Sequence, residues 1–137
     1  MAHARWATST CITALDLCAA GLGRCFCGHT GPREFDLGWF DPTNKRNAAS
    51  RDALPQLALQ WVDNVRGDPD YEQIMKVRHS LVHSRVTRHL TLAIGGPPVR
   101  VKLNVEGMQV PVRDLIELAR DVATKHVSAF FDLLPKV

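Results

Sequence analysis

The sequence lacks the patterns that most directly assign a function. No apolar run reaches 18 residues, so we expect no membrane-spanning helix. There is no G-x-S-x-G nucleophile motif, no phosphate-binding glycine loop and no dinucleotide-binding fingerprint. The run Gly95-Gly96-Pro97-Pro98 is predicted to be a turn, because no helix is expected to follow it. The best-marked hydrolase and nucleotide-binding classes are therefore not indicated.

Cysteine is also scarce, with four residues among 137. Cys11 and Cys18 lie seven residues apart on one expected helix, about 10 Å along its axis, which is too far for a disulfide. We therefore expect reduced thiols and a cytoplasmic protein. The segment 5–22 is interrupted by Arg5 and Asp16 and precedes no A-x-A cleavage pattern, which favours structure over a signal sequence.

Acidic residues are absent from one long segment. No Asp or Glu occurs between Lys76 and Lys102, although the net charge of the chain is only +3. Such a local excess favours an anionic partner, most commonly nucleic acid, and the alternative is a solvated basic face balanced elsewhere in the fold. The candidate nucleic-acid-binding residues are Lys76, Arg85, Arg88, Arg100 and Lys102.

What is present predicts one globular domain over 1–137, with 45% apolar and 23% charged residues. Helical periodicity predicts four main helices: 5–22, 53–66, one beginning at Asp68-Pro69, and 111–134. Gly67 leaves a very short connection, so the second and third are expected to form an antiparallel pair. Apolar and polar residues alternate between Thr87 and Val110, which predicts strands. The expected fold is mainly α, a four-helix bundle with a small antiparallel β-meander inserted before the last helix.

The third helix carries an arginine where an apolar residue is expected. Steps of 100° place Arg78 within a stripe of Tyr71, Ile74, Met75, Leu81 and Val82. An unpaired buried guanidinium is very costly, so Arg78 needs a carboxylate, a phosphate or an open cleft. Asp16, the only acid of the first helix, is a candidate partner, and the alternative is that Asp16 is simply exposed.

The segment R-H-S-L-V-H, Arg78 to His83, resembles the motif of HEPN (higher eukaryotes and prokaryotes nucleotide-binding) domains. These domains are helical bundles, commonly dimeric, and many are metal-independent ribonucleases. The resemblance implies that Arg78 holds the scissile phosphate and that His83 transfers a proton at the 2′-hydroxyl. His79 would occupy the polar position of the motif and orient the other two.

Helix geometry bears on this motif. Residues five apart point about 140° from each other, so Arg78 and His83 converge on one phosphate only if the helix loosens near its end or if two helices meet across a dimer axis. We favour the dimer, because it also places Arg78 next to a partner instead of in a sealed core. We therefore expect a homodimer that binds RNA. The alternative is a non-catalytic helical dimerisation or binding module in which Arg78 is a structural ion-pair residue. Arg24 and His29 repeat the spacing, but in a Gly- and Cys-rich loop.

Two groups have the chemistry of metal ligands. Cys25-x-Cys27-x-His29 offers thiolates and an imidazole, but it lacks the usual two-residue spacer and a second pair, so free thiols are favoured. His79 and His83 lie one turn apart without an acid in the following twenty residues. We expect no metal and no cofactor. His126, on the apolar stripe of the last helix, is predicted to be a core or interface histidine.

Overall fold

The structure, a computed structural model, describes residues 2–31, 36–82, 87–89, 102–105 and 108–137. In this part the protein is mainly helical, as predicted. Five α-helices are present rather than four: α1 (Ala2–Phe26), α2 (Ala48–Ala53), α3 (Gln56–Arg66), α4 (Pro69–Val82) and α5 (Val112–Leu133). Three short 3₁₀ helices accompany them: η1 (Leu37–Phe40), η2 (Lys45–Asn47) and η3 (Leu134–Lys136).

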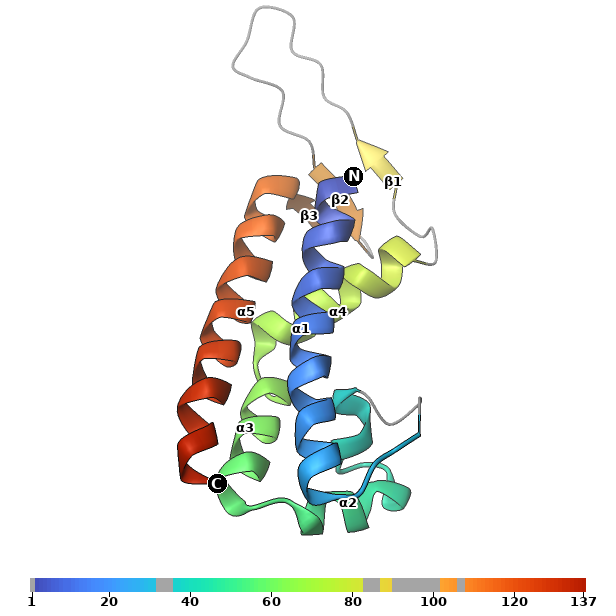
Figure 1. Cartoon of the computed structure of the whole chain (residues 1–137). Helices are drawn as coiled ribbons and strands as arrows, with labels where there is room; N and C mark the ends of the chain where they lie inside the picture. Colours follow the sequence, from blue (N-terminus) through green and yellow to red (C-terminus); the bar gives the residue numbers. More distant parts are fainter. Residues whose placement is uncertain (1, 32–35, 83–86, 90–101, 106–107) are drawn as a thin grey trace, which may run out of the picture.

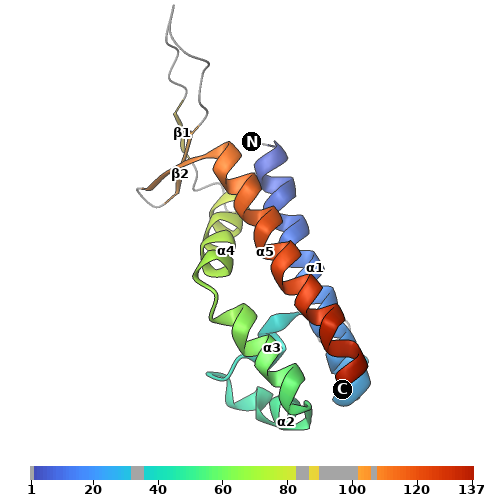
Figure 2. The same cartoon turned by 90° about the vertical axis from the view of Figure 1, so that its left-hand side faces the viewer.

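The two long helices form the frame of the molecule. Helices α1 and α5 lie side by side over their whole length and run in the same direction, from the end marked N to the end marked C (Figures 1 and 2). Helix α1 extends past both ends of the predicted segment 5–22, and it contains Gly21 and Gly23. Neither glycine ends the helix, although a glycine often does so.

Helices α3 and α4 do not form the predicted antiparallel pair. Helix α3 lies beside the lower half of the frame, and α4 continues beyond it beside the upper half (Figure 2). Gly67 between them is in the right-handed helical region, at φ −84° and ψ −4°, and its amide still bonds to the carbonyl of Asp63. Because Gly67 does not adopt the left-handed conformation, the chain bends there without reversing.

The start of α3 also differs from the prediction. Pro55 does not lie inside a helix from residue 53; it precedes α3, while α2 ends at Ala53. A proline has no amide hydrogen to donate and restricts the residue before it, and Leu54 is accordingly extended. The segment between α1 and α2 contains two short 3₁₀ helices, η1 and η2. Arg24 lies in the last turn of α1 and not in the expected Gly- and Cys-rich loop.

The apolar residues form two clusters that α4 connects. The larger lies between α1, α3, α5 and η1, and it contains Tyr71 and Ile74 from the first half of α4. The smaller contains Val77 and Leu81 from the second half of α4. It is completed by Ala4, Val110 and Leu115. The buried side of α4 therefore changes along the helix, which determines where Arg78 points.

Three short strands lie at the end of the molecule that carries the N-terminus (Figure 1). They are β1 (Thr87–His89), β2 (Lys102–Val105) and β3 (Met108–Pro111), paired antiparallel in that order. In this register Arg88 pairs with Leu103 and His89 with Lys102. The connections at 90–101 and 106–107 lie outside the described residues, so the complete meander remains a prediction. None of the described helices has the length and apolarity that a membrane span requires.

Candidate functional site

Helix α4 begins with the capping arrangement that its sequence predicts. The Asp68 carboxylate accepts a hydrogen bond from the amide of Asp70 at 2.9 Å, and Pro69 occupies the first helical position. Asp70 and Glu72 lie in the first turn, where the helix dipole favours negative charge. Local sequence therefore fixes the start of the helix that carries Arg78.

The same carboxylate fastens α4 to α5. Its Oδ2 accepts hydrogen bonds from Nε2 of His126 at 2.6 Å and from Nζ of Lys125 at 3.0 Å. Burial alone would raise the pKa of Asp68, but the hydrogen bonds from Lys125, His126 and the Asp70 amide outweigh it and hold the pKa at about 2. His126 is 4% exposed, which confirms it as a core histidine.

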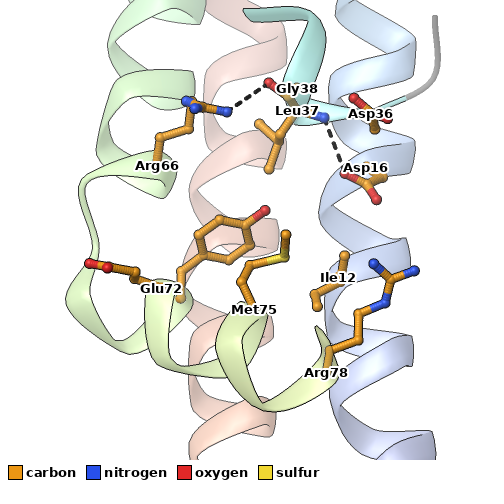
Figure 3. Close-up of a pocket in the computed structure, with 10 residues that line it drawn as sticks. Ile12, Asp16, Asp36, Leu37, Gly38, Arg66, Glu72, Met75 and Arg78 are labelled. Carbon is orange, nitrogen blue, oxygen red and sulfur yellow. Dashed lines mark hydrogen bonds between the residues drawn. The ribbon is translucent and has the colours of Figure 1, made fainter. Parts of the chain in front are cut away.

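Arg78 is exposed, and its expected place within the apolar stripe is wrong. After Ile74, the buried residues that the structure describes in α4 are Val77, Ser80 and Leu81. At 100° per residue, the centre of this buried side lies away from Arg78, whereas that of Tyr71 and Ile74 does not. The cause is that α4 leaves the larger core cluster after Ile74 and enters the smaller one at Val77. The guanidinium extends instead along α1, beside Ile12 (Figure 3).

A pocket of about 360 Å³ lies beside Arg78. Helix α1, η1, the end of α3 and helix α4 all contribute to its wall. It is lined by Ile12, Asp16, Asp36, Leu37, Gly38, Arg66, Tyr71, Glu72, Met75 and Arg78. Figure 3 shows the Arg78 and Asp16 side chains on the same side of this space. Arg78 therefore lies at a pocket, and an open cleft is one of the three settings that its position in the sequence predicts.

Asp16 is the half-buried acid of this pocket. Its Oδ1 accepts a hydrogen bond of 3.1 Å from the amide of Leu37, which joins α1 to η1. Burial raises the pKa of Asp16, and the nearby Asp36 raises it further, whereas the Leu37 amide and the charge of Arg78 lower it. Asp16 and Arg78 thus interact electrostatically without forming one of the ion pairs in the described part of the chain.

The other arginine of the pocket is occupied by structural contacts. Arg66 forms an ion pair of 3.0 Å with Asp41 and donates to the carbonyl of Leu37 at 3.2 Å. These contacts hold η1 against the end of α3, so that the backbone of Leu37 and Gly38 forms one wall of the pocket (Figure 3). Arg66 therefore shapes the pocket, while the guanidinium of Arg78 remains directed into it.

The remaining predicted site residues are only partly brought together. His79 is exposed beside Arg78 on α4, and Lys76 is exposed with an ion pair of 2.8 Å to Glu72. Arg88 and Lys102 belong to the neighbouring strands β1 and β2. His83, Arg85 and Arg100 lie outside the described residues. The structure therefore places one half of the R-x4-H motif.

Arg24 and His29, which repeat the R-x4-H spacing, do not line the pocket beside Arg78. His29 is buried, with its ring 6.1 Å from that of Phe40 and 5.4 Å from that of Trp39, whereas Arg24 is exposed. Cys27 Sγ donates to the carbonyl of Ser50 at 3.3 Å, and Cys25 is exposed. Within the described ranges no three histidine, cysteine or acidic side chains are grouped as a metal would require.

Ser50 and His29 have the contact of a nucleophile and its base, but the surroundings argue against that role. Nε2 of His29 lies 2.9 Å from Oγ of Ser50, while Nδ1 is buried and has no partner among the described residues. Placing the ring proton on Nδ1 would leave a buried donor unsatisfied, so the proton is better placed on Nε2. In that tautomer His29 donates to Ser50 and does not activate it.

No family model, no curated protein and no solved structure matches this chain. What the protein does must therefore follow from the chemistry of its own residues.

Several pocket residues carry no distinguishing sequence signal. Asp36 and Arg66 flank a loop and a helix end, where charged residues are ordinary, and only the fold brings them beside Arg78. Asp16 did carry a signal, because it is the single acid of a long and otherwise largely apolar helix segment. The pocket is assembled from residues up to 66 positions apart, between Ile12 and Arg78.

Proposed function

We propose that this protein is a HEPN-like RNA-binding protein that cleaves RNA without a metal ion. Arg78 binds the scissile phosphate, His83 transfers the proton of the 2′-hydroxyl, and His79 orients the two. The carrying observation is that Arg78, on the motif helix, is exposed at a pocket and takes part in no ion pair of the described chain. A guanidinium in this state is available to a phosphate arriving from solvent.

The proposed chemistry needs only groups of the chain and of the RNA. Neutral His83 accepts the proton of the 2′-hydroxyl, and the 2′-oxygen attacks the adjacent phosphorus. The bond from phosphorus to the 5′-oxygen breaks, the 5′-oxygen takes a proton from solvent, and His83 releases its proton to solvent. The products are a 2′,3′-cyclic phosphate and a free 5′-hydroxyl. Arg78 stabilises the charge that develops on the phosphate oxygens.

Helix geometry supports a homodimeric site. If the helix continued straight through His83, the angle of about 140° between residues five apart would keep Arg78 and His83 of one chain from meeting at one phosphate. A two-fold axis beside α4 would bring Arg78 of one protomer to His83 of its partner. The exposed position of Arg78 fits this arrangement, because a partner and an RNA strand can both reach it.

The basic segment after α4 would extend the RNA contact. We propose that 87–110 forms the complete β-meander of a helical bundle and presents Arg88, Arg100 and Lys102 to the phosphate backbone, together with Arg85 before it and Lys76 on α4. The ion pair of Lys76 with Glu72 is exposed and therefore weak, so it does not prevent such a contact. The four free cysteines favour a cytoplasmic location.

The alternative function is a non-catalytic helical dimerisation or binding module in which Arg78 is a structural ion-pair residue. Its central requirement is a buried partner for the guanidinium, and the exposure of Arg78 does not favour it. The two functions separate experimentally, because only the first requires that RNA be cut and that the cut depend on Arg78.

The test is cleavage of end-labelled single-stranded RNA in EDTA by the wild type, Arg78→Ala and His83→Ala. We expect the wild type to leave 2′,3′-cyclic phosphate ends and each variant to lose activity at least about 100-fold. The matched control is Arg113→Ala, since this α5 arginine is 88% exposed and outside the pocket. Undiminished cleavage by Arg78→Ala, or no binding of RNA by the wild type in fluorescence anisotropy, contradicts the proposal.

A further inference from the structure

The pocket beside Arg78 holds polar groups that the fold does not use. Arg66 is engaged by Asp41 and by the Leu37 carbonyl, and Oδ1 of Asp16 is engaged by the Leu37 amide. Oδ2 of Asp16 and the guanidinium of Arg78 have no hydrogen-bond partner in the described chain. One acceptor and one cationic donor therefore face the same space (Figure 3).

The size and walls of the pocket limit what can enter. Ligand pockets in proteins span about 300–1,000 Å³, so about 360 Å³ accommodates one flat ring system with a small substituent. Ile12 and Leu37 form an apolar part of the lining, and Met75 of α4 adds a thioether beside them. Apolar and sulfur-containing walls suit the face of an aromatic ring, whose edge would then reach the polar groups.

We propose that this pocket receives the base next to the phosphate held by Arg78, and that Asp16 selects guanine. The inference rests on the proposed RNA binding and adds its base specificity. A guanine presents two adjacent donors on its Watson–Crick edge, N1–H and the N2 amino group. A carboxylate can accept from both, because its two oxygens offer about four acceptor positions and the Leu37 amide uses one.

The other three bases match Asp16 less well. Adenine and cytosine each present one amino donor beside a ring nitrogen acceptor, which the carboxylate repels. Uracil presents one N–H between two carbonyl oxygens. A base can offer its Watson–Crick edge only when it is unpaired, so the expected ligand is single-stranded RNA. Asp16 would act as a specificity-determining residue, separate from the proton transfer assigned to His83.

The test uses fluorescein-labelled RNA octamers that are all uridine except for one central G, A, C or U. In anisotropy titrations with the wild type, we expect the G octamer to bind about tenfold more tightly than the U octamer. Asp16→Asn keeps an oxygen for the Leu37 amide but replaces the free acceptor with an amide donor. This variant should bind all four octamers within about twofold of the wild-type affinity for U.

Controls separate this inference from the proposed function. Asp121→Asn removes the same charge from an exposed acid of α5, outside the pocket, and should keep the G preference. A second variant is needed in case Asp16→Asn does not fold. Met75 lines the pocket and is 36% exposed, so Met75→Trp narrows the pocket from its surface. This variant should also lose the preference for the G octamer. Arg78→Ala should weaken all octamers alike.

Each pattern of binding has one meaning. Equal wild-type affinity for the four octamers overturns the base pocket and leaves RNA binding at Arg78 standing. A G preference that survives in both Asp16→Asn and Met75→Trp also overturns it. Failure of the wild type to bind any octamer overturns the proposed function and, with it, the inference.

Discussion

At the scale of single residues, Asp68 joins two helices through a single buried carboxylate. It caps α4 through the Asp70 amide and receives His126 and Lys125 from α5. The carboxylate is 4% exposed, so its hydrogen bonds are shielded from competing water. A helix cap is visible in a sequence, but a contact 58 residues away is not, because it depends on how α4 and α5 pack.

The depressed pKa of Asp68 predicts a specific loss of stability in acid. Its pKa is about 2 in the folded protein against 3.8 for an ordinary aspartate. The folded state therefore gains stability above about pH 4, and this gain disappears as the pH falls towards 2. We expect the gain to be about 1–2 kcal/mol, reduced from the full linkage value because Lys125 is largely exposed.

The measurement is urea denaturation of the wild type and Asp68→Asn between pH 7 and pH 2. Asparagine is also a good helix cap, so the variant isolates the charge of the carboxylate from its capping role. The difference in unfolding free energy between the two proteins should shrink below about pH 4. A difference that stays constant down to pH 2 would show that Asp68 has no unusual acidity.

Arg78 illustrates the limits of sequence reasoning at the same scale. The 100° step aligns Arg78 with Tyr71 and Ile74, and both of these residues are buried. Arg78 itself is exposed, because burial depends on which neighbour covers each part of the helix. The second half of α4 packs its Val77 side against the smaller core cluster, and this leaves Arg78 at the pocket.

At the scale of elements, α1 contains two glycines with different surroundings. A methyl group added to Gly21 would meet no atom within 4 Å. One added to Gly23 would lie 2.4 Å from Nδ1 of His29. The His29 ring cannot easily withdraw, because it contacts Trp39 and Phe40 and bonds to Ser50. Gly23 thus permits α1 and the chain that follows it to approach closely.

This contrast predicts opposite effects for the same substitution at two neighbouring sites. Gly23→Ala should lower the free energy of unfolding by about 1–3 kcal/mol, because the core around His29 would be overpacked. Gly21→Ala should raise it by up to about 1 kcal/mol, since alanine is the better helix former and nothing obstructs it. Chemical denaturation of both variants measures the difference, and equal effects would contradict the close contact.

The direction of α4 shows why element boundaries were easier to predict than element arrangement. The start of α4 follows from Asp68-Pro69, and the predicted Gly67 boundary of α3 is present. The predicted antiparallel pairing of α3 and α4 was wrong, because a glycine such as Gly67 is compatible with both a reversal and a bend of the chain. Its backbone conformation depends on the packing of α4 against α1 and α5, which local sequence does not contain.

At the scale of the whole molecule, α1 and α5 form a long frame along which α3 and α4 succeed one another (Figures 1 and 2). The pocket lies between α1, η1, the end of α3 and α4, and Arg78 is one of the residues that α4 contributes to its lining. If two protomers associate beside α4, as we propose, each site would take Arg78 from one chain and His83 from the other.

Mixing two inactive variants should restore cleavage. In a dimer of Arg78→Ala and His83→Ala chains, one of the two shared sites is intact and the other lacks both residues. We expect each mixed dimer to recover about half of the wild-type activity in EDTA, after the chains are exchanged by brief denaturation and refolding. Light scattering gives the mass of the species. Activity that stays absent in a verified mixed dimer would place both residues of a site on one chain.

The sequence by itself determined the mainly helical class, the capped start of α4 and the place of His126 on the apolar stripe of the last helix. Each of these follows from local periodicity, from a capping residue or from an apolar stripe. Only the tertiary structure decided that Arg78 is exposed, that α3 and α4 run on without reversing, and that Asp16 shares a pocket with Arg78. Those features arise from packing between elements that are distant in the chain, where many arrangements satisfy the same local pattern and the core selects one.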